Sequence, residues 1–225
     1  MAGGILLLAV FVIVGVFVGA PAAQPAGALM RFPDVRVAHM VEEVLYLGVL
    51  ALWAIHFVAL YRALRGTSLA PALFGSALGI MGLILLAAGA VPQVAKAPIS
   101  DLFHAPGATP GDQATLVLLW QATEGMLDAL LVAGLLLLPL GLIALGVAML
   151  RSPAFGKTYG WLSVMLGVAR IAAACALLVD VSDIAVVVIL ALIVFHLALG
   201  WKVLRLSGGP ARSFVSPIPA RGAVR

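Results

Sequence analysis

Six largely apolar runs, each about 20 residues long, constrain the fold of this chain more than any other feature of its sequence. A helix of that length crosses the hydrocarbon core of a bilayer and satisfies all of its backbone hydrogen bonds internally. Strands of a transmembrane barrel would be shorter and would alternate between apolar and polar residues. The runs cover about Gly4–Ala20, Met40–Tyr61, Ala70–Val91, Leu116–Leu138, Tyr159–Val179 and Ile184–Leu204. We therefore predict an all-α fold, a polytopic transmembrane helical bundle of about six spans.

The composition agrees with lipid as the solvent of this chain. Hydrophobic residues make up 64% of it and charged residues 10%, whereas soluble domains carry about 25% charged residues. We assign residues 1–206 to a single transmembrane domain and residues 207–225 to a basic cytoplasmic tail. Cys175 is the one cysteine, which excludes an intrachain disulfide.

The distribution of basic residues predicts the orientation of the bundle. They gather on one side of the predicted membrane, and acidic residues dominate the connections on the other side, so the positive-inside rule places both termini in the cytoplasm. A basic tail at this surface is expected to contact anionic lipid headgroups. It lacks the interleaved aromatic residues that would favour a nucleic acid. The basic residues on this side are Arg62, Arg65, Arg151, Lys157, Lys202, Arg205, Arg212, Arg221 and Arg225.

Two segments leave alternatives open. Residues 1–20 form either a retained first helix, acting as a signal anchor, or a cleaved signal peptide, because small residues follow the apolar run; residues 21–38 are then an outer loop. The fourth run continues to Leu150, which is too long for one untilted crossing. Its helix either tilts and projects into the cytoplasm or bends at Pro139.

Small residues recur at the spacing of a helix–helix interface. Gly75, Gly79 and Gly82 lie on one predicted helix, and Gly141 and Ala148 lie on another. Such residues let helix backbones approach closely in a membrane. They predict a compact bundle or a partner interface rather than chemistry.

Arg170 lies inside the fifth run, where a charge costs about 3 kcal/mol on insertion scales. A charge at this depth faces a partner or a water-filled cavity. Glu124 and Asp128 share one helix face of the fourth run, at a depth that overlaps that of Arg170. Glu43, near the outer start of the second run, can join them. The cluster is predicted to be either a ligand or proton pathway open to the outside or a structural ion pair.

His56 and His196 both lie nearer the cytoplasmic half of their runs. Two facing histidines can ligate a haem iron through its two axial positions. The alternative is that both are hydrogen-bonded packing residues, and our main expectation is that the chain holds no cofactor. His39 and Glu43 have a metal-compatible spacing, but a third ligand is missing, so no metal site is predicted.

Motifs of soluble enzymes are missing from the sequence. It contains no Gly-rich phosphate loop followed by Lys, no His-Glu-x-x-His and no Gly-x-Ser-x-Gly. ATP-driven and hydrolytic chemistry therefore have no support, and no catalytic residue is predicted.

One hairpin and one helix end carry a family resemblance. These are the sequence LGLIALGVAMLRS at 140–152 with FGKTYGWL at 155–162, and the sequence VALYRAL at 58–64. Over about His39 to Leu206, the chain resembles a bacterial family of uncharacterised multi-helix membrane proteins, a domain of unknown function. The resemblance implies a helical bundle in a bacterial cytoplasmic (inner) membrane and implies no activity. Pro153 precedes Phe155 here, whereas the family often has Pro after the Phe.

The expected function is that of a non-enzymatic integral membrane protein. It is either an accessory subunit of a larger membrane complex, with protein partners in the bilayer, or a bundle that binds a small or lipid-like ligand. The alternatives are a proton- or solute-translocating protein that uses the Glu124, Asp128 and Arg170 cluster, and a bis-histidine haem electron carrier.

Overall fold

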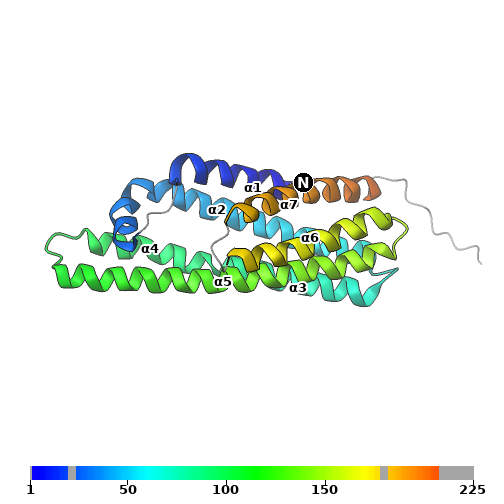
Figure 1. The fold of residues 1–225 in the computed structure, drawn as a ribbon. Coiled ribbons are helices and arrows are strands. Elements are labelled where there is room, and N and C mark those ends of the chain that lie inside the picture. The colour runs from blue at the N-terminus through cyan, green and yellow to red at the C-terminus, as the bar shows by residue number, and fades with distance from the viewer. Residues whose placement is uncertain (1, 20–23, 178–181, 208–225) are drawn as a thin grey trace, which may run out of the picture.

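The computed structural model describes residues 2–19, 24–177 and 182–207, and within them every regular element is a helix. Four helical segments are long and apolar enough to cross a membrane: Pro25–Leu64, Leu69–Phe103, Pro110–Leu150 and Gly156–Cys175. The prediction of an all-α transmembrane bundle is confirmed. The elements are α1 (Ala2–Ile13), the π-helical η1 (Val14–Val18), α2 (Pro25–Leu64), α3 (Leu69–Ala88), α4 (Ala90–Phe103), α5 (Pro110–Leu150), α6 (Gly156–Leu177) and α7 (Ser182–Ser207) (Figure 1).

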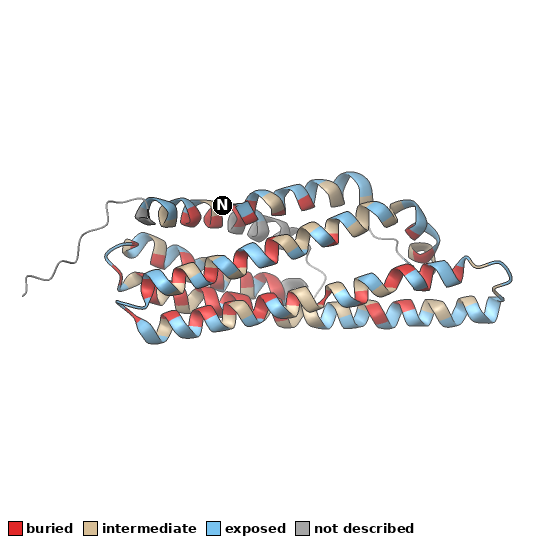
Figure 2. Ribbon diagram, turned by 180° about the vertical axis from the view of Figure 1, so that it is seen from behind, coloured by how far each residue is buried: buried red, intermediate tan, exposed pale blue. Residues whose placement is uncertain are grey.

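The helices form an elongated rod with two unlike halves (Figure 1). One half, which we call the apolar half, contains α3, α6, α7 and the C-terminal parts of α2 and α5. Most buried residues lie there (Figure 2). The other half is thinner and consists of α4 with the N-terminal parts of α2 and α5. We call this thinner half, residues 25–43, 90–103 and 110–128, the head.

The head exists because two helices are longer than a bilayer is thick. α2 has 40 residues and α5 has 41, so each is about 60 Å long. The hydrocarbon core measures about 30 Å. α5 starts at a capping box, in which Asp112 N donates to Thr109 Oγ1 at 3.2 Å and Thr109 N donates to Asp112 Oδ2 at 3.0 Å. It then runs as one helix through Pro139 to Leu150, so the proline does not end it.

α3 and α5 touch through their backbones. A Cβ atom added to Gly141 would lie 2.6 Å from Gly75 O and 2.6 Å from Gly79 N. One added to Gly82 would lie 2.8 Å from Leu138 N. No side chain fits between the helices at these points, so the predicted small-residue interface is present.

α5 and α6 pack antiparallel with a register that glycines fix. Gly146 meets Val164, and Gly167 meets Ile143, in both cases too closely for a Cβ atom. Projected along the helix, the end of α6 lies level with about residue 133 of α5. About 35 Å of α5 therefore extends past α6 toward the head.

Residues 25–38, predicted to be an outer loop, are instead the first turns of α2. Pro25 occupies the first helical turn, where its missing N–H is harmless. Leu29 and Phe32 then pack against Ile99, Phe103 and Trp120 in a separate apolar cluster inside the head. These first turns run at an angle to the rest of α2 (Figure 1), and Pro33, which lies inside the helix, supplies a physical cause for the bend.

α1 and η1 make a shorter apolar segment than the four candidate spans. α1 lies along α2, where a Cβ atom on Gly3 would meet the Trp53 ring at 2.8 Å and one on Gly48 would meet Leu6 at 3.2 Å. It starts beside the middle of the apolar part of α2 and runs toward the head (Figure 1). The segment predicted to be the first span is thus a helix, and it covers only part of the rod.

We expect Gly141→Ala to lower the free energy of unfolding by about 1–3 kcal/mol, because the new methyl group must push α3 and α5 apart. Gly125→Ala is the matched control, because Gly125 lies on the same helix with nothing within 4 Å of its added Cβ atom. That control is expected to be neutral or slightly stabilising. Thermal unfolding of both variants in detergent measures the difference, and equal effects would contradict the backbone contact.

Candidate functional site

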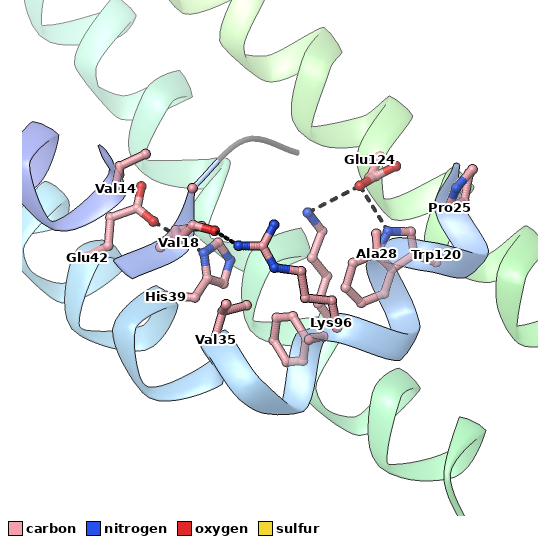
Figure 3. Close-up of a pocket in the computed structure, with 13 residues that line it drawn as sticks. Val14, Val18, Pro25, Ala28, Val35, His39, Glu42, Lys96, Trp120 and Glu124 are labelled. Atoms are coloured by element: carbon pink, nitrogen blue, oxygen red, sulfur yellow. Dashed lines mark hydrogen bonds and ion pairs between the residues drawn. The ribbon is translucent and has the colours of Figure 1, made fainter. Parts of the chain in front are cut away.

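A cavity of about 430 Å³ lies in the head, where the end of η1 approaches α2, α4 and α5. Figure 3 shows side chains from these elements converging on one space. Its walls are mostly apolar and its polar groups are few, which is the usual make-up of a small-molecule site. The lining residues are Val14, Val18, Gly19, Pro25, Ala28, Arg31, Phe32, Val35, His39, Glu42, Lys96, Trp120 and Glu124.

Three aromatic rings form one wall of this head pocket. Phe32 packs edge-to-face on Trp120 at 5.4 Å between ring centroids, and on His39 at 5.8 Å. Phe32 and His39 come from α2 and Trp120 comes from α5, so the rings fix the distance between the two helices. Phe32 and Trp120 are buried, which makes this wall rigid.

Lys96 and Glu124 form a charged pair beside the Trp120 ring of this wall. Lys96 Nζ lies 3.6 Å from Glu124 Oε1 and 5.1 Å from the centroid of the Trp120 ring. Trp120 Nε1 donates a hydrogen bond to Glu124 Oε1 at 2.9 Å (Figure 3). Trp120 and Glu124 can make this bond because they lie four residues apart on α5. Lys96 is only 8% exposed, so its charge is held mainly by this carboxylate and this ring.

Two further polar contacts complete the pocket. The Arg31 guanidinium donates to the Val18 carbonyl, which holds the end of η1 against α2. His39 Nδ1 lies 3.2 Å from Glu42 Oε2, one helical turn further along α2. His39 Nε2 is buried without a hydrogen-bond partner among the described residues.

A second cavity, of about 150 Å³, continues from the head toward the apolar half. Glu42 lines both cavities, and Glu43, Tyr46 and Gln93 line the second one. Glu43 is buried, and Gln93 Oε1 has no hydrogen-bond partner among the described residues. This inner cavity is thus polar enough to hold water.

Arg170 lies near this inner cavity rather than near Asp128. It interacts electrostatically with Tyr46, it is 8% exposed, and its Nη1 atom has no hydrogen-bond partner in the described part of the chain. Tyr46 in turn interacts with Glu43. Arg170 and Glu43 are therefore brought to one region through Tyr46.

The structure separates the other members of the predicted cluster. The α5–α6 register puts Arg170 level with about Leu140, so Asp128 lies about 18 Å further toward the head. Asp128 is exposed and belongs to no ion pair found among residues 2–19, 24–177 and 182–207, whereas Glu124 pairs with Lys96. The sequence predicted similar depths for Asp128 and Arg170 on the assumption that the start of α5 and the end of α6 lie at the same membrane surface. In the structure, the N-terminal part of α5 extends about 35 Å beyond the end of α6.

His56 and His196 do come together. Their ring centroids are 5.7 Å apart, and His196 stacks on Trp53 at 4.7 Å. Both histidines line a cavity of about 350 Å³ that the start of α1 borders. His56 Nε2 is buried without a hydrogen-bond partner among the described residues.

Sequence reasoning missed Lys96, Arg31 and the pocket role of Trp120. Lys96 lies beyond the predicted run Ala70–Val91, because the segment that forms α4 was not predicted to be a helix. Trp120 lies within the predicted run Leu116–Leu138 and is buried in the head. The spacing of Trp120 and Glu124 was the one available indication of their contact.

No protein-family model, curated protein or solved structure matches this chain. The family resemblance therefore stays a prediction. Within the described ranges, no group of three or more His, Cys, Asp or Glu side chains is arranged to hold a metal ion. The candidate site is defined by its geometry alone.

We expect Arg170→Met to keep or raise the thermal stability in detergent, because a buried guanidinium with an unpartnered nitrogen is costly and Met replaces its length with apolar atoms. Arg170→Ala is expected to lower the stability, since it leaves a cavity. Unfolding of the two variants, compared with wild type, separates charge from packing. A loss in Arg170→Met as large as that in Arg170→Ala would instead indicate that the charge is paired.

Proposed function

We propose that this chain is a non-enzymatic membrane protein that binds a small amphiphilic ligand in the head pocket. The observation that carries the proposal is a cavity of about 430 Å³ whose walls are apolar and aromatic and whose polar groups form a few defined pairs. Cavities of about 300–1,000 Å³ with this make-up hold small ligands. The accessory-subunit and translocation alternatives stay predictions.

The position of the pocket along the rod supports an amphiphile. We place the outer edge of the hydrocarbon near Gly89, between α3 and α4, with the basic connections at the cytoplasmic end. Lys96 then lies about 10 Å further out, at the depth of the lipid headgroups. An amphiphile in the bilayer could present its polar end at this level.

A tryptophan-quenching experiment tests the proposal. The probe is a nitroxide-labelled monoacylglycerol, added to a variant that keeps Trp120 and carries Phe at positions 53, 161 and 201. We expect saturable quenching of Trp120. Val35→Phe, which fills the pocket, is expected to weaken the affinity at least tenfold.

Val94→Phe is the matched control, because Val94 is an exposed valine of α4 that does not line the pocket. It is expected to bind the probe like the parent variant. Quenching that rises linearly without saturation, or equal affinity in Val35→Phe and the parent, would refute the proposed site.

The contact of His56 with His196 favours a second candidate, electron transfer through a haem held by both histidines. The 5.7 Å between the ring centroids supports it, as does the His56 Nε2 atom, which has no hydrogen-bond partner in the part of the chain that the structure describes. This candidate predicts a Soret band after addition of haem b to the purified protein, lost in His56→Ala and in His196→Ala. His104→Ala, at the end of α4, should keep the band, and a wild-type protein without one would exclude the candidate.

A further inference from the structure

The charges around the head pocket cancel each other. Arg31 and Lys96 contribute two positive charges, and Glu42 and Glu124 contribute two negative charges. A ligand with a single positive charge would be repelled by Arg31 and Lys96, and one with a single negative charge would be repelled by Glu42 and Glu124. Such repulsion is unfavourable in a partly desolvated site. The lining is therefore complementary to a group that carries both signs.

Lys96 is held by an ion pair with Glu124 and by the Trp120 ring rather than by a short hydrogen bond. Its side chain is 10% exposed, and its Nζ lies 3.6 Å from Glu124 Oε1, which is an ion-pair distance but longer than a hydrogen bond. No hydrogen bond of its ammonium group is found among the described residues. The ammonium faces the cavity (Figure 3), so an acceptor-rich anionic group entering there would receive its N–H groups.

The negative side is arranged differently. Glu124 already accepts the Trp120 Nε1–H bond at 2.9 Å, whereas Glu42 Oε2 lies 3.2 Å from His39 Nδ1. Glu42 also borders the inner cavity, so its carboxylate is reachable from two directions. A cationic group of a ligand would be attracted to this carboxylate.

Resting on the proposed function, we propose that the ligand is a phospholipid with a zwitterionic headgroup. Its phosphate lies at Lys96, and its ammonium lies at Glu42. Its acyl chain lies along the apolar walls formed by Ala28, Val35 and Phe32. These apolar walls favour a lipid over a phosphorylated amine that has no acyl chain.

Displacement of the nitroxide-labelled monoacylglycerol from the Trp120 variant measures headgroup preference. We expect lysophosphatidylethanolamine to displace the probe at a concentration at least tenfold lower than lysophosphatidylglycerol of the same chain length. Phosphoethanolamine without a chain is expected to leave the probe bound. Equal displacement by the two lysolipids, or displacement by phosphoethanolamine as effective as by its lysolipid, would overturn the inference.

Variants separate the headgroup contacts from folding. Lys96→Met is expected to weaken lysophosphatidylethanolamine about tenfold more than it weakens the uncharged monoacylglycerol probe, while Glu42→Gln should reduce the preference over lysophosphatidylglycerol. Arg36→Met is the control, because Arg36 pairs with Asp101 at 2.7 Å and does not line the pocket. If Lys96→Met weakens every probe alike, the headgroup assignment is wrong. If the parent protein binds no probe saturably, the proposed function itself fails.

Discussion

The contact between the backbones of α3 and α5 is the interaction on which the rest of the rod depends. In lipid, helices gain little from the hydrophobic effect on association, so close van der Waals packing must hold them together. Gly75 and Gly79 on α3 and Gly141 on α5 provide it by leaving no atoms between the helices. α5 then receives α6 on another face through Gly146 and Gly160. The long α5 is thus the central element, and its register with each neighbour is fixed by glycines.

The same packing explains why the head can hold a pocket. α3 and α6 pack against α5 in the apolar half. The C-terminus of α6 does not reach the N-terminal part of α5, which lies in the head. Beyond that level, α5 is accompanied by α4 and by the first turns of α2. Three helices with a small apolar cluster fill less of the interior than the full bundle does. The space that they and the end of η1 enclose is a cavity lined by the three aromatic rings and the charged pairs.

Buried polar groups are distributed along the axis of the rod in a consistent order. Lys96 lies in the head, Glu43 lies at the inner cavity, and Arg170 lies beyond them. Each is costly to bury without a partner, and those that lack one line or adjoin a cavity. Water or a ligand in these cavities would satisfy them, which links the proposed binding site to the polar residues deeper in the bundle.

The sequence by itself determined the helical character of the chain, most of its spans and the small-residue faces. Helix length, apolar run and glycine spacing are properties of a single segment, and they can be found without knowing its neighbours. The shared face of Glu124 and Asp128 also follows from spacing alone. The tertiary structure alone decided that Glu124 meets Lys96 and that Arg170 meets Tyr46. The physical reason is axial register: a helix can slide along its neighbour without changing its own pattern, and only contacts between helices, such as the glycine contacts of α5 with α3 and α6, fix which residues lie at the same level.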